Sequence, residues 1–316
     1  MRVLVTGGTG YLGAAIVRAL LRHGHTPVTF ARGASRSGTP GDFVDGDIRD
    51  RDAVARAARG ADAVCHTAAL VSIWRRRPQE FDEINIGGLQ TVLSVCAELN
   101  IPRVVYTSSF LARAPAGASA PLSANDYQRT KVAARDIVRD AAKRGAPIFA
   151  LLPGVIYGPG AATEGNLVGR LVADHLAGRL PGIVGADRQW SFSYVDDVAD
   201  AHVAALTHGE PGREYLVGGE NAPQMRLFEM LRALKGTPLP RRIPYAVASA
   251  IGAVEEARAR LLGRPPLITR GAVEIFRHDW PLDSRESTET LGYRFRPLAE
   301  GLRLALETGT PGGALR

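Results

Sequence analysis

A tyrosine and a lysine four positions apart, Tyr127 and Lys131, are the residues of this chain best suited to proton transfer. On a helix, positions i and i+4 lie on the same face, so the phenol and the ammonium can meet one substrate. A lysine charge favours the phenolate and is expected to lower the tyrosine pKa from its free value of about 10. The pair therefore predicts a general acid and base that works near neutral pH. The alternative is that both side chains are solvated on a surface helix.

A glycine-rich turn near the N-terminus predicts a dinucleotide site. An apolar run at residues 3–5 leads into Thr6-Gly7-Gly8-Thr9-Gly10-Tyr11-Leu12-Gly13, and a helical pattern follows as far as Gly24. The glycines allow a tight turn and let a pyrophosphate approach the helix N-terminus, where free N–H groups favour an anion. We therefore expect the turn to contact a cofactor through Gly7, Gly10, Tyr11, Leu12 and Gly13.

The end of the second predicted strand, residues 27–31, bears on the choice of cofactor. NAD-binding proteins usually carry an acid there for the ribose hydroxyls, about 20 residues past the glycines. This chain has Ala31 and Arg32 instead, and a guanidinium suits a 2′-phosphate. The sequence therefore favours NADP(H). Binding of NAD(H), with Arg32 merely solvated, is the alternative.

Strands and helices alternate over the first half of the chain. Further strands are predicted at 43–48, 61–67, 103–107 and 148–152, with helices at 52–59, 81–100 and 126–144. This alternation predicts a parallel, doubly wound (Rossmann) α/β sheet in residues 1–153. The small residues Ala68 and Ala69 leave space for a cofactor at the carboxyl end of a strand. His66 is expected to have a structural role beside them.

The second half of the chain has a different pattern. Residues 153–160 are rich in turn formers, and helices are predicted at 166–177, 195–208, 225–234, 245–262 and 298–308. We expect residues 154–308 to form a smaller, mainly helical lobe that covers the cofactor crevice and supplies the substrate pocket. The segment 191–208 is expected to return to the first domain, and 309–316 to be a frayed tail.

Composition excludes several classes of protein. The chain has 316 residues, 45% of them hydrophobic, and a net charge of +7, and its arginines do not gather with aromatics into a nucleic-acid-binding stripe. Cys65 and Cys96 are isolated and read as buried thiols, so no metal site is expected. No signal peptide precedes the first strand, and the apolar run 246–254 is too short to span a bilayer. We expect a cytoplasmic protein without stable membrane insertion; a homodimer is left open. The run 246–254 could touch a membrane surface, but its flanking turn and Glu255-Glu256 favour a buried or lid helix.

Several motifs together resemble the extended short-chain dehydrogenase/reductase family, in nearly the whole chain. Within the family, the chain is similar to the dihydroflavonol-reductase-like branch, which includes farnesol-dehydrogenase-type enzymes, in three segments: Ser108-Ser109-Phe110-Leu111-Ala112, Gly178-Arg179-Leu180-Pro181-Gly182-Ile183 and Arg277-His278-Asp279-Trp280. The motifs that carry the resemblance fall in family order: Thr6-Gly7-Gly8-Thr9-Gly10-Tyr11-Leu12-Gly13, Gly46-Asp47-Ile48, His66-Thr67-Ala68-Ala69, Asn85-Ile86-Gly87-Gly88, Val105-Tyr106-Thr107-Ser108-Ser109, Tyr127 with Lys131, Val155-Ile156-Tyr157-Gly158-Pro159-Gly160, and Tyr194-Val195-Asp196-Asp197-Val198-Ala199.

The resemblance assigns roles to particular residues. Ser109 would hydrogen-bond the reacting oxygen, Tyr127 would exchange the proton, and Lys131 would lower the tyrosine pKa and hold the nicotinamide ribose. Further cofactor contacts are implied for Asp47, Ile48, Thr67, Ala68, Ala69, Pro153 and Val155. Substrate contacts are expected from Phe110, Tyr157, Trp190 and Phe192. The segment between Ser109 and Tyr127 is shorter than is usual in the family, and Leu89 stands where a threonine is common.

Two departures from the family bear on the substrate. Sugar-nucleotide epimerases and dehydratases commonly carry an arginine before the proline of the Y-G-P-G segment and an Arg-Asp-aromatic run before V-D-D. Here those places hold Leu152 and Trp190-Ser191-Phe192, and a diphosphate is best bound by guanidinium groups. The sequence therefore favours hydride exchange between NADP(H) and a hydrophobic alcohol or ketone of terpenoid, steroid, flavonoid or polyketide type.

Two other functions are kept as alternatives. One is a sugar-nucleotide epimerase or dehydratase with tightly bound NAD, which would use the same three catalytic residues. The other is a non-catalytic dinucleotide sensor, because a fold does not determine a function. The complete set of Ser109, Tyr127 and Lys131 argues against a sensor, which has no need of a proton relay.

Overall fold

The computed structural model describes residues 1–161 and 163–308, and its main element is a seven-stranded parallel sheet. The strand order is β3-β2-β1-β4-β5-β6-β9. The bounds are β1 Arg2–Thr6, β2 Thr26–Ala31, β3 Asp42–Asp45, β4 Ala63–His66, β5 Val104–Thr107, β6 Ile148–Pro153 and β9 Glu214–Val217. The predicted doubly wound Rossmann sheet is confirmed.

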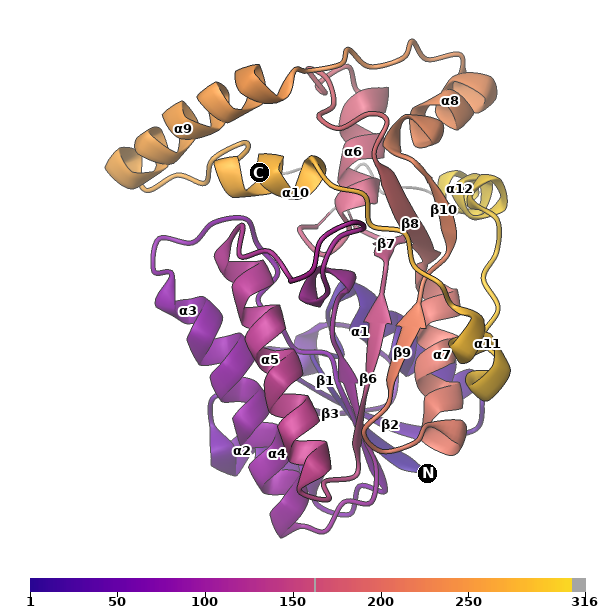
Figure 1. The fold of residues 1–316 in the computed structure, drawn as a ribbon. Coiled ribbons are helices and arrows are strands. Elements are labelled where there is room, and N and C mark those ends of the chain that lie inside the picture. Colours follow the sequence, from indigo (N-terminus) through magenta and orange to yellow (C-terminus); the bar gives the residue numbers. More distant parts are fainter. Residues whose placement is uncertain (162, 309–316) are drawn as a thin grey trace.

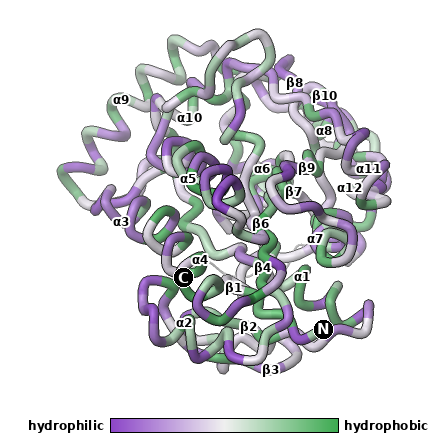
Figure 2. The backbone as a smooth tube through the Cα atoms, turned by 60° about the horizontal axis from the view of Figure 1, so that its bottom comes forward, coloured by the Kyte–Doolittle hydropathy of each residue, from purple (hydrophilic) through white to green (hydrophobic). Residues whose placement is uncertain are grey.

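Helices cover both faces of this sheet (Figure 1). One face packs on α1 (Tyr11–Arg22), α7 (Val195–His208) and α11 (Arg285–Leu291), and the other on α2 (Arg51–Ala58), α4 (Gly88–Glu98) and α5 (Asp126–Lys143). Successive strand residues point to opposite faces, so Val3 and Val5 join the first core while Leu4 joins the second. Figure 2 shows the hydrophobic strands β1 and β4 between these helical layers.

The second lobe is built on a small sheet and five helices. The sheet has the order β10-β8-β7, with β7 Val155–Tyr157, β8 Gln189–Tyr194 and β10 Glu220–Pro223. The helices are α6 (Leu167–Leu176), α8 (Gln224–Lys235), α9 (Tyr245–Leu262), α10 (Arg270–Phe276) and α12 (Leu298–Glu307). A core rich in aromatic side chains joins β7 and β8 to α8 and α12, so this lobe has a hydrophobic core of its own.

The structure differs from the sequence-based prediction in four places. Residues 154–161 and 163–308 contain four short strands as well as helices, and β9 completes the main sheet. β3 ends at Asp45, so residues 46–48 form a turn after it. The predicted helix 81–100 is a short α3 (Gln79–Phe81), a π-helical stretch Asp82–Gly87, and α4. The helix predicted to be buried or a lid, α9, exposes Val247, Ile251 and Val254.

Two further predictions concern the segment 191–208 and the C-terminus. In the segment 191–208, residues 191–194 lie in β8 of the small sheet, whereas α7 packs on α1. The tail 309–316, predicted to be frayed, lies outside the described residues. Among residues 1–161 and 163–308, no helix combines the length and the apolar character needed to cross a bilayer.

Candidate active site

Ser109 and Tyr127 come from two elements that meet above the carboxyl end of β5. Ser109 follows this strand closely and caps a short 3-10 turn, Phe110–Ala112, by accepting a hydrogen bond from the Leu111 N–H at 3.2 Å. Tyr127 lies in the first turn of α5, whose N-terminus is capped by the Asn125 side chain. A cap of this kind fixes where the helix begins, and so fixes the position of Tyr127.

Lys131 connects α5 to β5. Its side chain is buried, and Nζ donates a hydrogen bond to the backbone oxygen of Thr107 at 3.0 Å. The same nitrogen lies 6.0 Å from the ring centroid of Tyr127 and 5.2 Å from that of Tyr106. The three predicted catalytic residues are therefore brought together at one edge of the sheet.

The electrostatics of the pair differ from the sequence-based expectation. Burial raises the pKa of Tyr127 to about 12, and the neighbouring Ser109 hydroxyl opposes this rise. Burial also lowers the pKa of Lys131 to about 8. The expected lowering of the tyrosine pKa is wrong for this structure, because removal of the phenol from water is the largest influence on it and raises the pKa.

Gln128 is a positioning residue that the sequence analysis did not single out. Its side chain is fully buried; Nε2 donates to the Leu111 oxygen at 3.1 Å, and Oε1 accepts from the Ala124 N–H at 3.1 Å. These two bonds fasten both ends of the loop between Ser109 and α5 to the helix that carries Tyr127. The shortened loop is thus held by the residue next to Tyr127.

A second missed connection links Thr107 to α7. His202 Nδ1 lies 2.8 Å from the carbonyl oxygen of Val198, which can only accept, so Nδ1 carries the proton. Its Nε2 then accepts the hydroxyl proton of Thr107 at 2.9 Å. Burial lowers the pKa of His202 to about 4, which keeps the ring neutral. Thr107 is therefore bound through its side chain to α7 and through its carbonyl to Lys131.

The predicted structural histidine and the family asparagine are both buried and bonded. His66 Nδ1 lies 2.7 Å from the Thr6 hydroxyl, and burial lowers its pKa to about 3. Asn85 lies in the π-helical stretch and donates from Nδ2 to the Thr130 hydroxyl at 3.0 Å. His66 is thus fixed to the end of β1, and Asn85 connects the backbone of Leu70 to Thr130 of α5.

The glycine turn has the shape that a pyrophosphate requires. Gly7 has a φ of +74° and donates its N–H to the Phe30 oxygen at 2.8 Å. A Cβ on Gly13 would collide with the Gly7 oxygen, and one on Gly7 would come 2.8 Å from Ala68. α1 begins with no side chain capping it at Gly10, so its first N–H groups remain available to an anion. These residues fit a dinucleotide.

Other predicted cofactor residues lie along the same edge. Thr67, Ala68 and Ala69 follow β4 half-buried, while Pro153 ends β6 and Val155 is buried at the start of β7. Leu12 is half-buried in the first turn of α1. The carboxyl ends of β1, β4 and β6 thus bring these residues to one crevice.

Tyr11, also predicted to contact the cofactor, packs against the second lobe as well. A Cβ on Gly160 would come 3.0 Å from its ring, and one on Gly158 would come 3.4 Å from its hydroxyl. Burial raises the pKa of Tyr11 far above its usual value.

The predicted adenosine side of the site contains both charged and apolar groups. Ile48 is buried against Gly88, and Asp47 is bonded to Arg49 at 2.8 and 2.9 Å. Hydrogen bonds from Arg49 lower the pKa of Asp47 to about 2. Arg32 follows β2, and within the described residues it has no carboxylate at ion-pair distance.

The predicted substrate residues divide into two groups. Phe110 is half-buried, and its ring meets Trp280 edge-on at a centroid distance of 5.4 Å. Tyr157, Trp190 and Phe192 are 1%, 3% and 2% exposed and lie in the core of the second lobe. Trp190 stacks on Phe276 at 5.1 Å. We call Phe110, Trp190, Phe276 and Trp280 the aromatic cluster.

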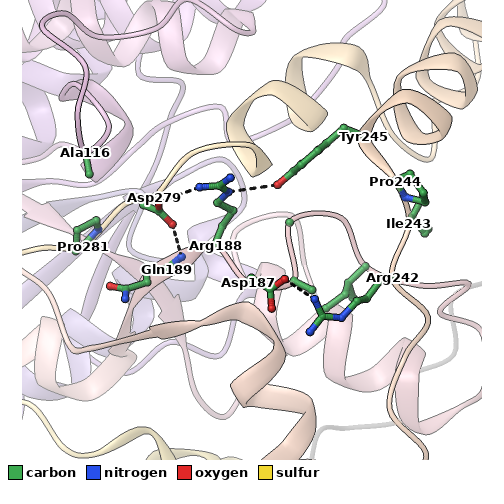
Figure 3. A pocket seen from close by; sticks show the side chains of 13 residues that line it. Ala116, Asp187, Arg188, Gln189, Arg242, Ile243, Pro244, Tyr245, Asp279 and Pro281 are labelled. Carbon is green, nitrogen blue, oxygen red and sulfur yellow. Dashed lines mark hydrogen bonds and ion pairs between the residues drawn. The ribbon is translucent and has the colours of Figure 1, made fainter.

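A cavity of about 710 Å³ lies beside this cluster in the second lobe. It is lined by Ile183, Ala186, Arg188, Arg242, Tyr245 and Asp279, among others. Figure 3 shows Arg188 between Asp279 and Tyr245, and Arg242 against Asp187. Gln189, Asp279 and Pro281, which are chain neighbours of Trp190 and Trp280, line the cavity, whereas the four rings of the aromatic cluster do not.

Comparison with known proteins agrees with this geometry. The sequence profile of the NAD-dependent epimerase/dehydratase family matches residues 3–218. This chain belongs to that family. It is an NAD(P)-dependent enzyme of the extended short-chain dehydrogenase/reductase type, as the motifs indicated. The family includes reductases as well as epimerases and dehydratases.

The proteins to which this chain is similar include both a reductase and an epimerase. The chain is 33% identical to sterol demethylase protein B of Methylococcus capsulatus, over 92% of this chain and 93% of the relative. It is 32% identical to 2-alkyl-3-oxoalkanoate reductase of Stenotrophomonas maltophilia, over 89% and 91%. Among solved structures it is similar to gox2253 (TM-score 0.81, 27% identity, 97% of each chain). It is also similar to the NAD complex of Thermus thermophilus UDP-glucose 4-epimerase (TM-score 0.77, 25% identity, 99% and 100%).

Proposed function

We propose that this family member exchanges hydride between NADP(H) and a hydrophobic alcohol or ketone, with Tyr127 as the acid and base. The observation that carries the proposal is the aromatic cluster beside Ser109. Phe110 directly follows the serine, and its ring contacts Trp280, which pairs along the backbone with Trp190. Apolar substrates gain from burial, at about 25 cal/mol per Å², and aromatic rings provide a large contact area.

The charges around the cavity support an uncharged substrate. Arg188 is bonded to Asp279 at 3.2 Å, and Arg242 is paired with Asp187. Arg277, another arginine of this lobe, lies 3.6 Å from Glu274 and over the ring of Tyr245. A diphosphate would have to displace carboxylates from these guanidinium groups, which costs free energy that an uncharged ligand does not.

The chain's own residues can perform the proton transfer. With a pKa of about 12, Tyr127 is protonated at neutral pH and can donate its proton to a substrate oxygen. The Ser109 hydroxyl lies next to it to hydrogen-bond the same oxygen. Lys131, held by Thr107, can bond a ribose hydroxyl and supply positive charge. The bound nicotinamide would supply or accept the hydride.

The preference for NADP(H) rests on Arg32. It lies at the carboxyl end of β2, where the ribose of the adenosine would be expected, and no carboxylate among the described residues pairs with it. A free guanidinium there can bind a 2′-phosphate. NAD(H) is the alternative that the family also uses.

A sugar-nucleotide epimerase or dehydratase is the second candidate function. It is favoured by one observation, namely that two arginines line a cavity large enough for a nucleotide. It is disfavoured by the residues at the two positions where such enzymes commonly carry arginine. Those residues are Leu152 and Trp190, and both are buried among apolar side chains.

Calorimetry of the NADP-loaded protein distinguishes the two functions. We expect saturable binding of at least one hydrophobic ketone or alcohol from a terpenoid, steroid, flavonoid and polyketide panel, and none of UDP-glucose or UDP-galactose. Phe110→Ala should raise KM for the active ketone by about tenfold, the loss of roughly 1.4 kcal/mol of contact. Phe43→Ala, which alters an exposed ring on β3, is the matched control. Binding of the sugar nucleotides alone would reverse the assignment.

A further inference from the structure

The helix α9 turns its acidic side chains toward the protein. Glu255 and Glu256 are each only 14% exposed, and they pair with Arg258 at 2.6 Å and with Arg270 at 2.9 Å. The fully buried positions of the helix are small residues, Ala248, Gly252 and Ala259. α9 therefore meets the protein through small and polar groups.

The outward side of α9 is apolar. From residue 246 to residue 257, every exposed residue is alanine, valine or isoleucine. The larger of these, Val247, Ile251 and Val254, are 49%, 44% and 67% exposed. Helices at the surface of a soluble domain usually show the opposite arrangement, with charges outward. An exposed apolar surface of this kind marks a site of contact with another body.

The C-terminal end of α9 continues this surface. Leu261, Leu262 and Leu267 are 85%, 63% and 83% exposed. We call these leucines, together with Val247, Ile251 and Val254, the α9 face. In both views α9 extends along the edge of the molecule (Figures 1 and 2).

Arginines surround the end of the α9 face. Arg260 and Arg264 are exposed, and Arg76 approaches Gly263 closely enough that a Cβ there would lie 3.4 Å from its guanidinium. Within residues 1–161 and 163–308, none of the three has a carboxylate at ion-pair distance. The surface thus combines apolar side chains with uncompensated positive charge.

We propose that the α9 face is a docking surface for a membrane that contains anionic phospholipids, with α9 lying in the plane of the headgroups. Apolar side chains enter the boundary between headgroups and acyl chains, and basic residues beside them are attracted to anionic lipid. A second copy of this chain fits less well, because the exposed α9 surface offers no acidic side chain to Arg260, Arg264 or Arg76.

Docking through this face would bring the cavity to the membrane. Tyr245, the first residue of α9, lines the cavity, and its hydroxyl oxygen lies 3.4 Å from Nε of Arg188. A substrate dissolved in the bilayer could then enter the enzyme without crossing water. The docking itself rests only on the α9 face and its arginines, and so is independent of the proposed activity.

Co-sedimentation of the full chain with lipid vesicles tests the proposal. We expect binding to phosphatidylcholine vesicles that contain phosphatidylglycerol, weaker binding to phosphatidylcholine alone, and a decrease with salt. The double variant Val254→Glu/Leu261→Glu should bind at least about tenfold more weakly. The variant Arg260→Glu/Arg264→Glu should lose the preference for the anionic lipid.

Controls separate docking from other effects. Leu234→Glu, which places the same charge at a residue 47% exposed on α8, should bind vesicles as the wild type does, and all variants should keep the wild-type melting temperature. If the wild type binds neither kind of vesicle, or the double variant binds as well as the wild type, the proposal is overturned. A dimer in solution that the double variant converts to monomer, with no vesicle binding, would assign the face to a second copy instead.

Discussion

The ammonium of Lys131 donates a hydrogen bond to the backbone carbonyl of Thr107, 3.0 Å away. Through the side chain of Thr107 this contact continues to His202 and α7. The helix α5, which carries Tyr127 and Lys131, is thereby connected, across the carboxyl end of β5, to a helix on the opposite face of the sheet. Lys131 is buried at this junction, and its separation from water lowers the pKa of its ammonium group.

The activity should decline above about pH 8. Burial lowers the pKa of Lys131 to about 8, and loss of its proton removes the positive charge beside Tyr127 and a donor for a ribose hydroxyl. The pH profile of kcat/KM, which reports groups of the free enzyme, should show a descending limb near that value.

The free energy of unfolding should change with pH in the opposite direction to this decline in activity. The pKa of Lys131 is lower in the folded chain, at about 8, than its ordinary value of 10.5. Between these values the unfolded chain binds more protons, so this group makes the free energy of unfolding rise with pH. A melting temperature that falls in step with activity from pH 8 would contradict the assignment to Lys131.

Replacing the phenol of Tyr127, the proposed acid and base, should abolish most turnover. Tyr127→Phe removes the proton donor, and general acid–base catalysis is worth about 10²–10⁴-fold. Cofactor affinity, measured by fluorescence titration with NADPH, should remain nearly unchanged. A variant that retains wild-type turnover when chemistry limits the rate would show that another group transfers the proton.

Replacing Gln128 should lower turnover, although we expect no contact between Gln128 and the substrate. Gln128→Ala removes bonds to Leu111 and Ala124 and leaves the buried oxygen of Leu111 without a partner, at about 1–3 kcal/mol of stability. We expect kcat to fall more than KM rises, because the loop that carries Ser109 is released.

A matched amide controls for the stability loss. Asn221, an exposed residue of β10, likewise bonds two backbone groups, the N–H and the oxygen of Leu282. Asn221→Ala should lower the melting temperature and leave kcat unchanged. Equal effects of the two substitutions on kcat would reduce Gln128 to a purely structural residue.

The preference for NADPH should depend on Arg32. Arg32→Ala should weaken NADPH binding by about tenfold or more while NADH binding changes little, since only the 2′-phosphate loses a partner. Arg59→Ala, an exposed arginine just after α2, serves as the control. Tighter binding of NADH than of NADPH by the wild type would refute the cofactor proposal.

Two glycine substitutions should differ in their effect on cofactor binding. Gly13→Ala places a methyl group against the Gly7 oxygen and should disrupt the turn and dinucleotide binding together. Gly24 has a φ of +74° with open space around it, so Gly24→Ala should cost only about 1 kcal/mol of backbone strain. Titration with the cofactor and thermal unfolding of both variants provide the comparison.

The first half of the fold was predictable because its signals are local. The apolar run of β1, the glycine turn and the start of α1 lie next to one another in the sequence, and so do Tyr127 and Lys131. The strands β7 and β10 were missed because they are three and four residues long, and β10 ends in a proline. Such short edge strands have no periodicity of their own.

The parts of the site that sequence could not predict depend on distant residues. His202 and Thr107 are 95 positions apart, and only the packing of α7 on the sheet brings them together. The raised pKa of Tyr127 has the same origin, since the ring packs against the core of the second lobe. The burial of Trp190 and Phe192 likewise depends on β10, α8 and α10, which follow them in the chain.

The position of β9 has a consequence for how the protein is made. β6 ends at Pro153. Its neighbour β9, residues Glu214–Val217, is synthesised only after β7 and β8, two of the three strands of the small sheet. Until then a nascent chain exposes the edge of β6, with unpaired N–H and C=O groups that can pair with other chains. Cutting the gene after residue 153 would leave this edge without its partner strand, so we expect the first half, produced alone, to associate through β6.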